Sequence, residues 1–440
     1  MLERLFGLSA RGTSVRTEVI AGCTTFLTAA YIIFVQPAVL GAAGMDSGAV
    51  LTATCLATAL ATGIMAFWAN YPFVVAPAMG HNFFFAYTVV IAGGTPWQVA
   101  LGAVAIAGIL FILTAGYGLR ELVMRSLPES FTHAIGVGIG LLIALIGLEW
   151  GGVIVDSPGT LVTLGDLTQP PVMLTLGTLA LIAVLHARGV PGATLIGMLA
   201  AATGALALGL TGWSGRLVSM PPSLEPTFLQ LDIRGALSPA LIDAVFVFFF
   251  LALFDSVGTL IGLVNRIGLV RGGTFPRARQ ALLADAAGTV AGAMLGTSTV
   301  TAYVESSSGV AAGGRTGLAA LVVSLLFLVA LFFHPIVELV GGGYSTGEGL
   351  TLYPVIAPAL ILVGATMMEG VRHVKWTDFT EALPAFLAII IMPMTFSITD
   401  GIAFGLIAYA VVKAGAGRAR EIHPLVYVLA ALFVVRYVAF

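Results

Sequence analysis

The stretch of sequence that decides the fold runs from Gly296 to Gly314 and reads GTSTVTAYVESSSGVAAGG. It lies in an apolar part of the chain, but the residues from Thr297 to Thr301 are hydroxyl-bearing or β-branched, which favours extended backbone over a continuous helix. We therefore expect a short extended piece and then a half-helix that starts near Tyr303 to Glu305. Non-helical backbone is tolerated inside a bilayer only where protein buries it or where it lines a cavity, so this stretch is a candidate binding site.

Two acidic residues accompany this break. Glu305 belongs to the stretch itself, and Asp255 stands 50 residues earlier in the apolar segment FFFLALFDSVGTLIG. An acidic side chain at the centre of a bilayer costs about 2.5 to 3.5 kcal/mol on insertion scales, so such residues are rare and usually face a functional cavity. Both acids are therefore candidate ligands for a substrate.

The composition indicates a polytopic membrane protein. Of the 440 residues, 59% are hydrophobic and 9% are charged, whereas roughly 25% are charged in an average soluble domain. The net charge of -2 argues against a nucleic-acid partner. Cys23 and Cys55 lie in separate apolar segments without the spacing of metal ligands, so we expect packed thiols, no metal and no organic cofactor. The first 18 residues lack the features of a signal peptide, so the first span should stay in the membrane.

A length of about 20 apolar residues is needed for each membrane span. With Gly, Pro and charged clusters as boundaries, the sequence predicts an all-α polytopic protein. A final apolar stretch, His423 to Phe440, is either a fifteenth span or a helix at the membrane interface, and its Arg436 favours the interface. The predicted segments number fourteen and cover residues 18–40, 49–68, 73–91, 97–117, 131–149, 172–187, 190–210, 238–265, 280–296, 297–312, 316–334, 354–370, 380–397 and 400–414.

The positions of the basic residues predict the orientation. Short cytoplasmic loops carry an excess of Lys and Arg, and with the N-terminus in the cytoplasm only Arg216 and Arg234 fall on the outside. We expect a protein of the cell membrane in this orientation. The sixteen residues predicted on the cytoplasmic side are Arg4, Arg11, Arg16, Arg120, Arg125, Arg188, Arg266, Arg271, Arg277, Arg279, Arg315, Arg372, Lys375, Lys413, Arg418 and Arg420.

The third span repeats the design of the tenth. It begins FVVAPAMGHNFFFAYTVV at residue 73, where two valines precede Pro77 and Gly80, residues that end or kink helices. Spans three and ten are seven apart, and because seven is odd, two halves of seven spans must be inverted relative to each other. Gln36 and Asn82 are 46 residues apart, close to the 50 that separate Asp255 from Glu305. Interrupted segments at corresponding positions of two halves indicate a transporter site near the midplane.

The residues at this crossing suit a flat, neutral, polar heterocycle. Half-helix N-termini carry free N–H groups and a partial positive charge. The carboxylates of Asp255 and Glu305 would accept ring N–H or amino protons, while Asn82 and Gln36 can donate and accept. Phe83, with Phe84, Phe85 and Tyr303, offers faces for stacking. Either acid could also carry a proton as the site changes access, so we expect proton symport with Asp255 or Glu305 as carrier, and sodium coupling less.

Each of these residues also has a purely structural alternative. Glu305 could cap its own half-helix, Asp255 could bind hydroxyls such as Thr259 or Ser298, and Asn82 could be an N-cap. His81 could be a packing residue, and the phenylalanines could be core filler. Asp285 in span nine is expected to pair within the core. An intramembrane enzyme is disfavoured, because no nucleophile and base or metal cluster has suitable spacing.

The sequence resembles the nucleobase/ascorbate transporter superfamily, and within it the azaguanine-like branch of guanine/hypoxanthine/adenine permeases. The resemblance covers essentially the whole chain. It is carried by FLTAAYIIFVQPAVL, LFDSVGTLIG, ALLADAAGTVAGAMLGTSTVTAYVESSSGVAAGGRTGLAALV, PALILVGATMM and DFTEALPAFLAIIIMPMTFSITDGIAFG. It implies fourteen spans as a 7+7 inverted repeat and no enzyme activity. It also implies a core domain (residues 1–126 and 237–340), a gate domain (127–236 and 341–440, with the apolar tail), and elevator-like alternating access between them.

The resemblance also implies roles for individual residues. Substrate would lie between the two domains on the half-helices of spans three and ten, with Asp255 as the span-eight acid and Glu305 as the span-ten acid. Tyr303 and Val304 would offer backbone groups to the base. Many relatives are dimers joined through gate domains, so a homodimer is expected. The implied substrate is a purine such as hypoxanthine, guanine, adenine or xanthine.

One motif departs from the branch. Where its members usually have PGMGLNAFF, this chain reads PAMGHNFFF from Pro77 to Phe85, so that Ala78, His81 and Phe83 replace a glycine, a leucine and an alanine beside Asn82. This leaves uracil or another heterocycle open as the substrate. An anion carrier of the related sulfate-permease type is a further alternative, against which the two acids argue because they would repel an anion.

Overall fold

The structure is a computed structural model of the whole chain, and it describes residues 2–117, 128–238, 241–269, 275–346 and 351–439. The predicted cytoplasmic residues Arg120, Arg125 and Arg271, and the predicted domain boundary at residue 126, lie outside the described residues. Within them the chain is mostly helical, with three short two-stranded ribbons. In the described part of the chain, eight helices are long and apolar enough to cross a membrane.

The elements of the first half follow the predicted spans. They are α1 (Leu2–Phe6), η1 (Ser9–Arg11), α2 (Val15–Ala29), α3 (Ile32–Ala42), α4 (Ser47–Ile64), η2 (Met65–Ala69), β1 (Val75–Pro77), α5 (Met79–Phe83), η3 (Phe84–Ala92), α6 (Trp97–Tyr117), α8 (Glu129–Trp150), β2 (Ile154–Ser157), β3 (Leu161–Leu164), α9 (Pro170–Ala187), α10 (Ala193–Ala207) and α11 (Ile233–Ala236).

The second half has the same kind of order. Its elements are α12 (Ile242–Arg266), α13 (Ala278–Leu295), β4 (Val300–Ala302), α14 (Ser306–Ala311), α15 (Gly317–Ala330), η5 (Leu331–Phe333), α16 (His334–Gly341), β5 (Tyr344–Ser345), β6 (Thr351–Leu352), α17 (Ala357–Met367), η6 (Met368–His373), α18 (Phe379–Thr395), α19 (Ile398–Gly415), η7 (Ala419–Glu421) and α20 (Pro424–Ala439).

The centre of the fold is an antiparallel ribbon made by the two interrupted segments. Strand β1 pairs with β4 in the register Val75↔Ala302, Ala76↔Thr301 and Pro77↔Val300, and all six residues are buried. A helix follows each strand, α5 after β1 and α14 after β4. Because the strands are antiparallel, these helices start at opposite ends of the ribbon. The predicted breaks in spans three and ten, each with an extended piece before a half-helix, are therefore confirmed.

A threonine from the preceding helix holds each strand. The hydroxyl of Thr62 in α4 accepts from the N–H of Val75 at 3.0 Å and donates to its carbonyl at 3.2 Å. Thr289 in α13 does the same for Val300, at 3.2 and 2.9 Å. In the second half, Asp285 also accepts the N–H of Ala302 at 3.1 Å. These matching contacts come from corresponding helices of the two halves, and they satisfy backbone groups that the bilayer would leave without water.

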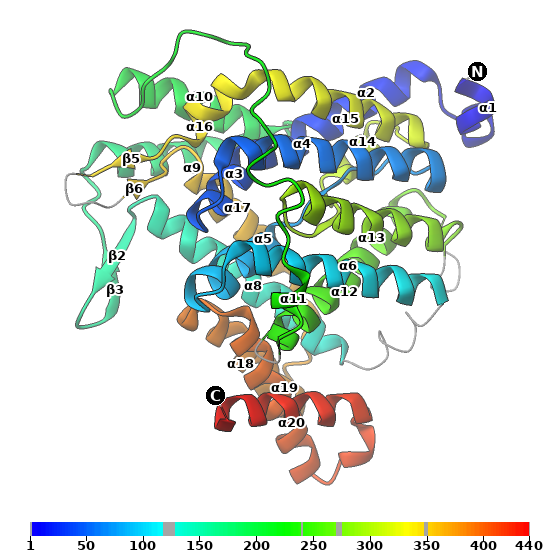
Figure 1. Cartoon of the computed structure of the whole chain (residues 1–440), viewed down its shortest axis with the longest axis vertical. Coiled ribbons are helices and arrows are strands. Elements are labelled where there is room, and N and C mark those ends of the chain that lie inside the picture. The colour runs from blue at the N-terminus through cyan, green and yellow to red at the C-terminus, as the bar shows by residue number, and fades with distance from the viewer. Residues whose placement is uncertain (1, 118–127, 239–240, 270–274, 347–350, 440) are drawn as a thin grey trace.

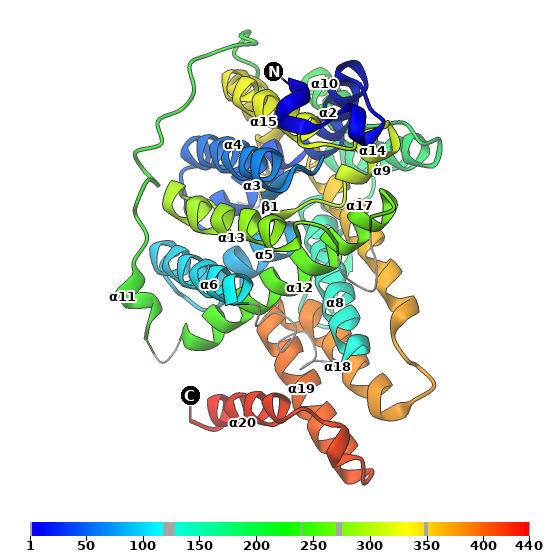
Figure 2. The ribbon, with the colours of Figure 1, turned by 90° about the vertical axis from the view of Figure 1, so that its right-hand side faces the viewer.

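The helices pack as two groups. The first helix group contains the ribbon together with α2, α3, α4, α6, α12, α13, α14 and α15, and the second contains α8, α9, α10, α17, α18 and α19. Figure 2 shows α4, α13 and α6 stacked on one side, with α8, α17 and α18 on the other. The two groups meet where α12 contacts α19 and where α2 contacts α10. The half-helix α5, which follows β1 of the ribbon, also contacts α8. Small residues allow close approach within the groups, as at Gly364 of α17, where an added Cβ would lie 2.4 Å from the carbonyl oxygen of Gly140.

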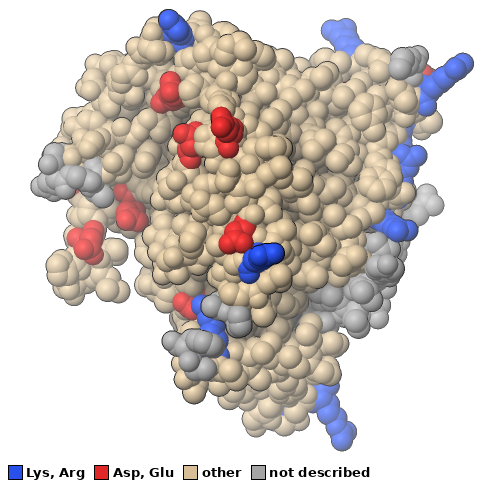
Figure 3. Space-filling view, viewed as in Figure 1, with Lys and Arg blue, Asp and Glu red and all other residues tan. Residues whose placement is uncertain are grey.

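Charged side chains are separated on the surface. In the face shown in Figure 3, acidic residues lie over the left half and the centre, while Lys and Arg line most of the right-hand edge. We call this edge, where α1 lies, α4 ends and α13 begins (Figure 1), the basic end.

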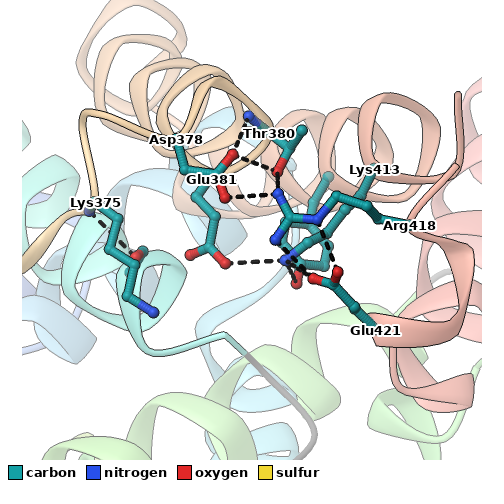
Figure 4. Close-up of polar contacts among 9 residues, drawn as sticks. Lys375, Asp378, Thr380, Glu381, Lys413, Arg418 and Glu421 are labelled. Atoms are coloured by element: carbon teal, nitrogen blue, oxygen red, sulfur yellow. Dashed lines mark hydrogen bonds and ion pairs between the residues drawn. The ribbon is translucent and has the colours of Figure 1, made fainter. Parts of the chain in front are cut away.

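An ionic network links the start of α18 to the end of α19 and to the segment that follows α19. Arg418 pairs with Asp378 at 2.7 Å and with Glu421 at 2.8 Å, and Lys413 pairs with Glu381 at 2.9 Å (Figure 4). Asp378 also accepts the N–H of Thr380 at the start of α18. The hydrogen bonds from Arg418 and Thr380 lower the pKa of Asp378 to about 2. The network therefore stays ionised at neutral pH and joins the ends of α18 and α19.

The C-terminal helix α20 runs alongside α19 in the opposite direction. At one end the hydroxyl of Tyr427 donates to the carbonyl of Ala419, and at the other the hydroxyl of Tyr437 contacts Asp400 at 2.5 Å. Arg436 pairs with Asp243 of α12 at 2.6 Å. The helix thus covers the same depth as α19 and does not lie across its end. At 16 residues α20 is shorter than the helices long enough to cross a membrane, so the interfacial helix stays a prediction.

Glu18 of α2 fixes the start of α15. Its carboxylate has no exposed surface and accepts hydrogen bonds from the N–H groups of Arg315, Thr316 and Ala319 at 2.8, 3.3 and 3.2 Å. An acidic group at a helix N-terminus is favoured by the partial positive charge there. The contact ties span one to span eleven.

We predict that Glu18→Ala destabilises the fold. The substitution leaves buried N–H groups without an acceptor, which costs about 1 to 3 kcal/mol for each group that water does not reach. The midpoint of thermal unfolding in detergent should fall by several degrees. Glu3→Ala is the control, since Glu3 is exposed and accepts only from Ser9. Equal midpoints for both variants would contradict the assigned role.

Candidate substrate site

Asp255 lies at the middle of α12, beside the ribbon. Its carboxylate accepts hydrogen bonds from Thr301 of β4 at 3.1 Å and from Thr259, one turn along α12, at 3.4 Å. Neither Asp255 nor Glu305 forms an ion pair with any described residue. The side chain of Asp255 is exposed to a cavity between the two helix groups. It can therefore meet a molecule that enters this space.

This Asp255 cavity has a volume of about 310 Å³ and is mostly apolar. It lies between α5, α8, α12 and α19, with α17 and α20 at its margins. The polar residues at its wall are few, as is usual for small-molecule sites. They are His81, Thr132, His133, Asp255 and Thr259.

His81 reaches this cavity from the first turn of the span-three half-helix. It is 3% exposed, and neither ring nitrogen has a hydrogen-bond partner among the described residues. A buried polar group without a partner costs free energy unless a ligand or water satisfies it. His81 and Asp255 are thus two polar groups available on one cavity.

Glu305 lies at a different place. It occupies the position before α14, but its side chain makes no capping hydrogen bond and instead accepts from the hydroxyl of Tyr31 at 2.7 Å. Its carbonyl accepts from Thr28 at 3.3 Å. These residues line a second cavity, the Glu305 cavity, of about 600 Å³, which also contacts α9, α10 and α17.

In the state described the two acids line different cavities, so their joint contact with one substrate stays a prediction. Asp255 faces its cavity from the long helix α12, whereas Glu305 faces the other from the start of the half-helix α14. Both cavities contact α17, one at Met367 and the other at Val363 and Thr366. The sequence spacing matched Asp255 and Glu305 to Gln36 and Asn82, whereas in the structure Asp255 is hydrogen-bonded to Thr301.

Asn82 and Gln36 are brought together, but away from both cavities. Both are fully buried, and their amides bond to each other in two directions. The hydroxyl of Ser298 also donates to the Asn82 oxygen, and the Gln36 amide donates to Thr297 at 2.9 Å. Asn82 lies inside α5, so it is not an N-cap. This network joins spans one, three and ten, and neither residue lines the cavities as the sequence had suggested.

Of the other residues predicted at the site, Tyr303 and Phe83 are buried and Val304 lines a cavity. Tyr303 is buried, and its hydroxyl donates to the carbonyl of Pro77 across the ribbon. Val304 is 59% exposed and lines the Glu305 cavity. Phe83 has no exposed surface and stacks on Tyr87 with ring centroids 5.7 Å apart, so it belongs to the core.

Sequence reasoning missed the aromatic wall of the Asp255 cavity. Phe246, Phe250 and Phe254 occur at every fourth position of α12, and successive ring centroids are 4.2 and 5.5 Å apart. Their spacing places them on one helix face with Asp255 next to the last of them. This periodicity could have identified them. The tyrosine that contacts Glu305, Tyr31, gave no such signal.

These features define a class: a multi-pass membrane transporter built around two interrupted segments. The chain matches the model of a permease family, Xan_ur_permease, over residues 16–404. It belongs to this family, the nucleobase/ascorbate transporter family. It is 44% identical to the adenine permease AdeP of Escherichia coli over 439 residues, which covers 100% of this chain and 96% of the relative. It is 42% identical to the guanine/hypoxanthine permease PbuO of Bacillus subtilis over 437 residues, 98% of this chain and 99% of the relative.

A solved structure shows the same fold. The transmembrane domain of the cyanobacterial bicarbonate transporter BicA aligns with a TM-score of 0.65 and 15% sequence identity, covering 88% of this chain and 97% of that domain. This likeness confirms the predicted inverted-repeat transporter fold. The relatives are permeases, so the chain is a transporter and not an enzyme.

We predict that Gln36 and Asn82 act as one unit. Gln36→Ala and Asn82→Ala should each destabilise the protein, but because they remove shared hydrogen bonds, the double variant should lose less than the sum by about 0.5 to 3 kcal/mol. Thermal unfolding of the four proteins in detergent measures this coupling. Gln36→Ala with Thr52→Ala is the control pair, since Thr52 contacts Pro222 instead. Additive effects of Gln36→Ala and Asn82→Ala would contradict the network.

Proposed function

We propose that the protein imports purine nucleobases by proton symport. The observation that carries the proposal is Asp255, an acid on a transmembrane helix that is exposed to the mostly apolar cavity between the two helix groups and has no cationic partner among the described residues. Relatives named adenine and guanine/hypoxanthine permeases support the substrate class. The cavity of about 310 Å³ falls at the lower end of small-molecule sites, which run from about 300 to 1,000 Å³.

The Asp255 cavity offers what a base needs. The carboxylate of Asp255 accepts a ring N–H or amino proton, and His81 can donate or accept from the facing helix. The rings of Phe250 and Phe254 give an aromatic face, and stacking of a base on such a face is worth about 1 to 3 kcal/mol. We assign Glu305 and Val304 to the same substrate site, as the family resemblance implies for the half-helix of span ten, although in the state described they line the Glu305 cavity.

Coupling follows from the acids. An ionised carboxylate without a cation is costly in a low-dielectric site, and a bound proton removes this cost. Asp255 and Glu305 are therefore the proposed proton carriers, with sodium as the less favoured ion. Proton and base would load together and be released together when the site changes access.

Access would change by an elevator-like movement. We assign the first helix group to a core domain (residues 1–126 and 237–340) and the second to a gate domain (127–236 and 341–440), with a possible homodimer formed through the gate domains. Both cavities are lined by residues toward the basic end, such as Thr132 in the first turn of α8 and Pro191 between α9 and α10. With the N-terminus in the cytoplasm of a cell-membrane protein, as the basic end supports, the state described is inward-facing.

The competing proposal is an anion carrier, since BicA, a bicarbonate transporter, has the same fold. The unpaired acids at both cavities disfavour an anion. Uracil, a smaller heterocycle than a purine, is included as a competitor in the uptake experiment below.

We predict that radiolabelled adenine or hypoxanthine is taken up by cells lacking their own permeases, and that a protonophore stops its accumulation. Unlabelled adenine, guanine, hypoxanthine, xanthine, uracil and bicarbonate are compared as competitors. His81→Leu, which restores the residue usual in the branch, should change the ranking of the bases because a polar group is removed from the wall. Competition by bicarbonate alone would overturn the proposal, and an unchanged ranking would show that His81 only packs.

We predict different failures for the two acids. Asp255→Asn keeps the shape of the side chain but cannot release a proton, so exchange of labelled for unlabelled base should persist while accumulation is lost. Glu305→Gln should abolish binding. Glu338→Gln is the control, because Glu338 is an exposed acid on α16 that contacts only His334. Uptake equal to that of the unaltered protein in both variants would refute the assignment.

A further inference from the structure

A second histidine lines the Asp255 cavity, at its edge nearest the basic end. His133 lies in the second turn of α8, next to Thr132 and one turn before Gly136, and all three contact the cavity. Its side chain is half-buried, so it is neither a core residue nor a freely exposed one. The substrate site proposed above gives no role to His133.

The ring of His133 stacks on that of His373, with centroids 4.7 Å apart and planes inclined by 28°. His373 ends η6 and is exposed at the surface. The stacked rings therefore bring an imidazole on the cavity wall into contact with one at the protein surface.

Two ion pairs lie on the elements next to the histidines. Glu369 and Arg372 pair with each other at 3.6 Å, and Glu381 pairs with Lys413 at 2.9 Å. The groups on the elements around His133 are Glu129 on its own helix, His373, Glu369 and Arg372 on η6, Lys375 after it, Glu381 on α18, Asp400 and Lys413 on α19, and Asp255 and His81 across the cavity.

We propose that His133 is the residue through which the coupled proton leaves the Asp255 cavity for the cytoplasm, with His373 as its partner at the surface. This inference rests on the proposed proton symport with Asp255 as carrier. Histidine suits the task because its unperturbed titration lies near neutral pH.

The step conserves atoms and charge. The O–H bond of protonated Asp255 breaks and an N–H bond forms on His133, directly or through cavity water, which leaves a carboxylate and an imidazolium. The N–H bond of the imidazolium then breaks, and the proton passes to water or buffer on the cytoplasmic side. His133 returns to the neutral form and can accept the next proton.

The test separates proton release from substrate movement. The purified full-length protein is reconstituted in liposomes, and radiolabelled adenine and hypoxanthine are followed in two assays: net uptake driven by a pH gradient, and exchange at equal pH on both sides. In His133→Gln, net uptake should fall by about tenfold, while exchange stays within about twofold, because exchange needs no net proton release. His373→Gln should reduce net uptake less and should shift its dependence on internal pH.

Controls make each outcome informative. His334→Gln changes a histidine on α16 that lies outside the cavity and pairs with Glu338, and it should leave both assays unchanged. If net uptake and exchange fall together in His133→Gln, or if neither falls, the inference is overturned. If the unaltered protein shows no uptake driven by a pH gradient, proton symport itself fails, and the inference fails with it.

Discussion

The fold depends on one constraint: two stretches of extended backbone lie at membrane depth, where water cannot satisfy their peptide groups. The ribbon of β1 and β4 meets this constraint by pairing the two stretches with each other. The hydroxyls of Thr62 and Thr289 then close the outer edges, one in each half. Helices α3, α4, α12 and α13 contact this ribbon, and α6, α14 and α15 pack on those helices, so the position of both half-helices follows from it.

The two halves share a plan but differ in chemistry at one position. Gln36 bonds to Asn82, 46 residues later, and Asp255 bonds to Thr301, also 46 residues later. The first pair is neutral, fully buried and tied to neighbouring hydroxyls. The second is an acid at a cavity. In the first half of the inverted repeat this position is a buried hydrogen-bonded amide pair. In the second half it is a carboxyl group that can change its charge.

Much of the fold could be predicted from sequence because its signals are local. Runs of apolar residues gave the segments, and β-branched residues before Pro77 and after Gly296 gave the breaks. The partners of the acids could not be predicted, since they depend on which end of the ribbon each half-helix leaves. Asn82 was expected at a substrate and bonds to Gln36 instead, because an amide can satisfy another amide as well as a ligand. Tyr31 and His133 carry no sequence pattern, and only packing brings them to the cavities.

The C-terminal helix has a mechanical consequence. It packs along α19 in the second helix group, yet its Arg436 is paired with Asp243 at the start of α12, the helix that carries Asp255. The last turn of α20 therefore links the second helix group to α12. In the elevator movement proposed above, this ion pair would limit how far α12 can travel before the pair has to break.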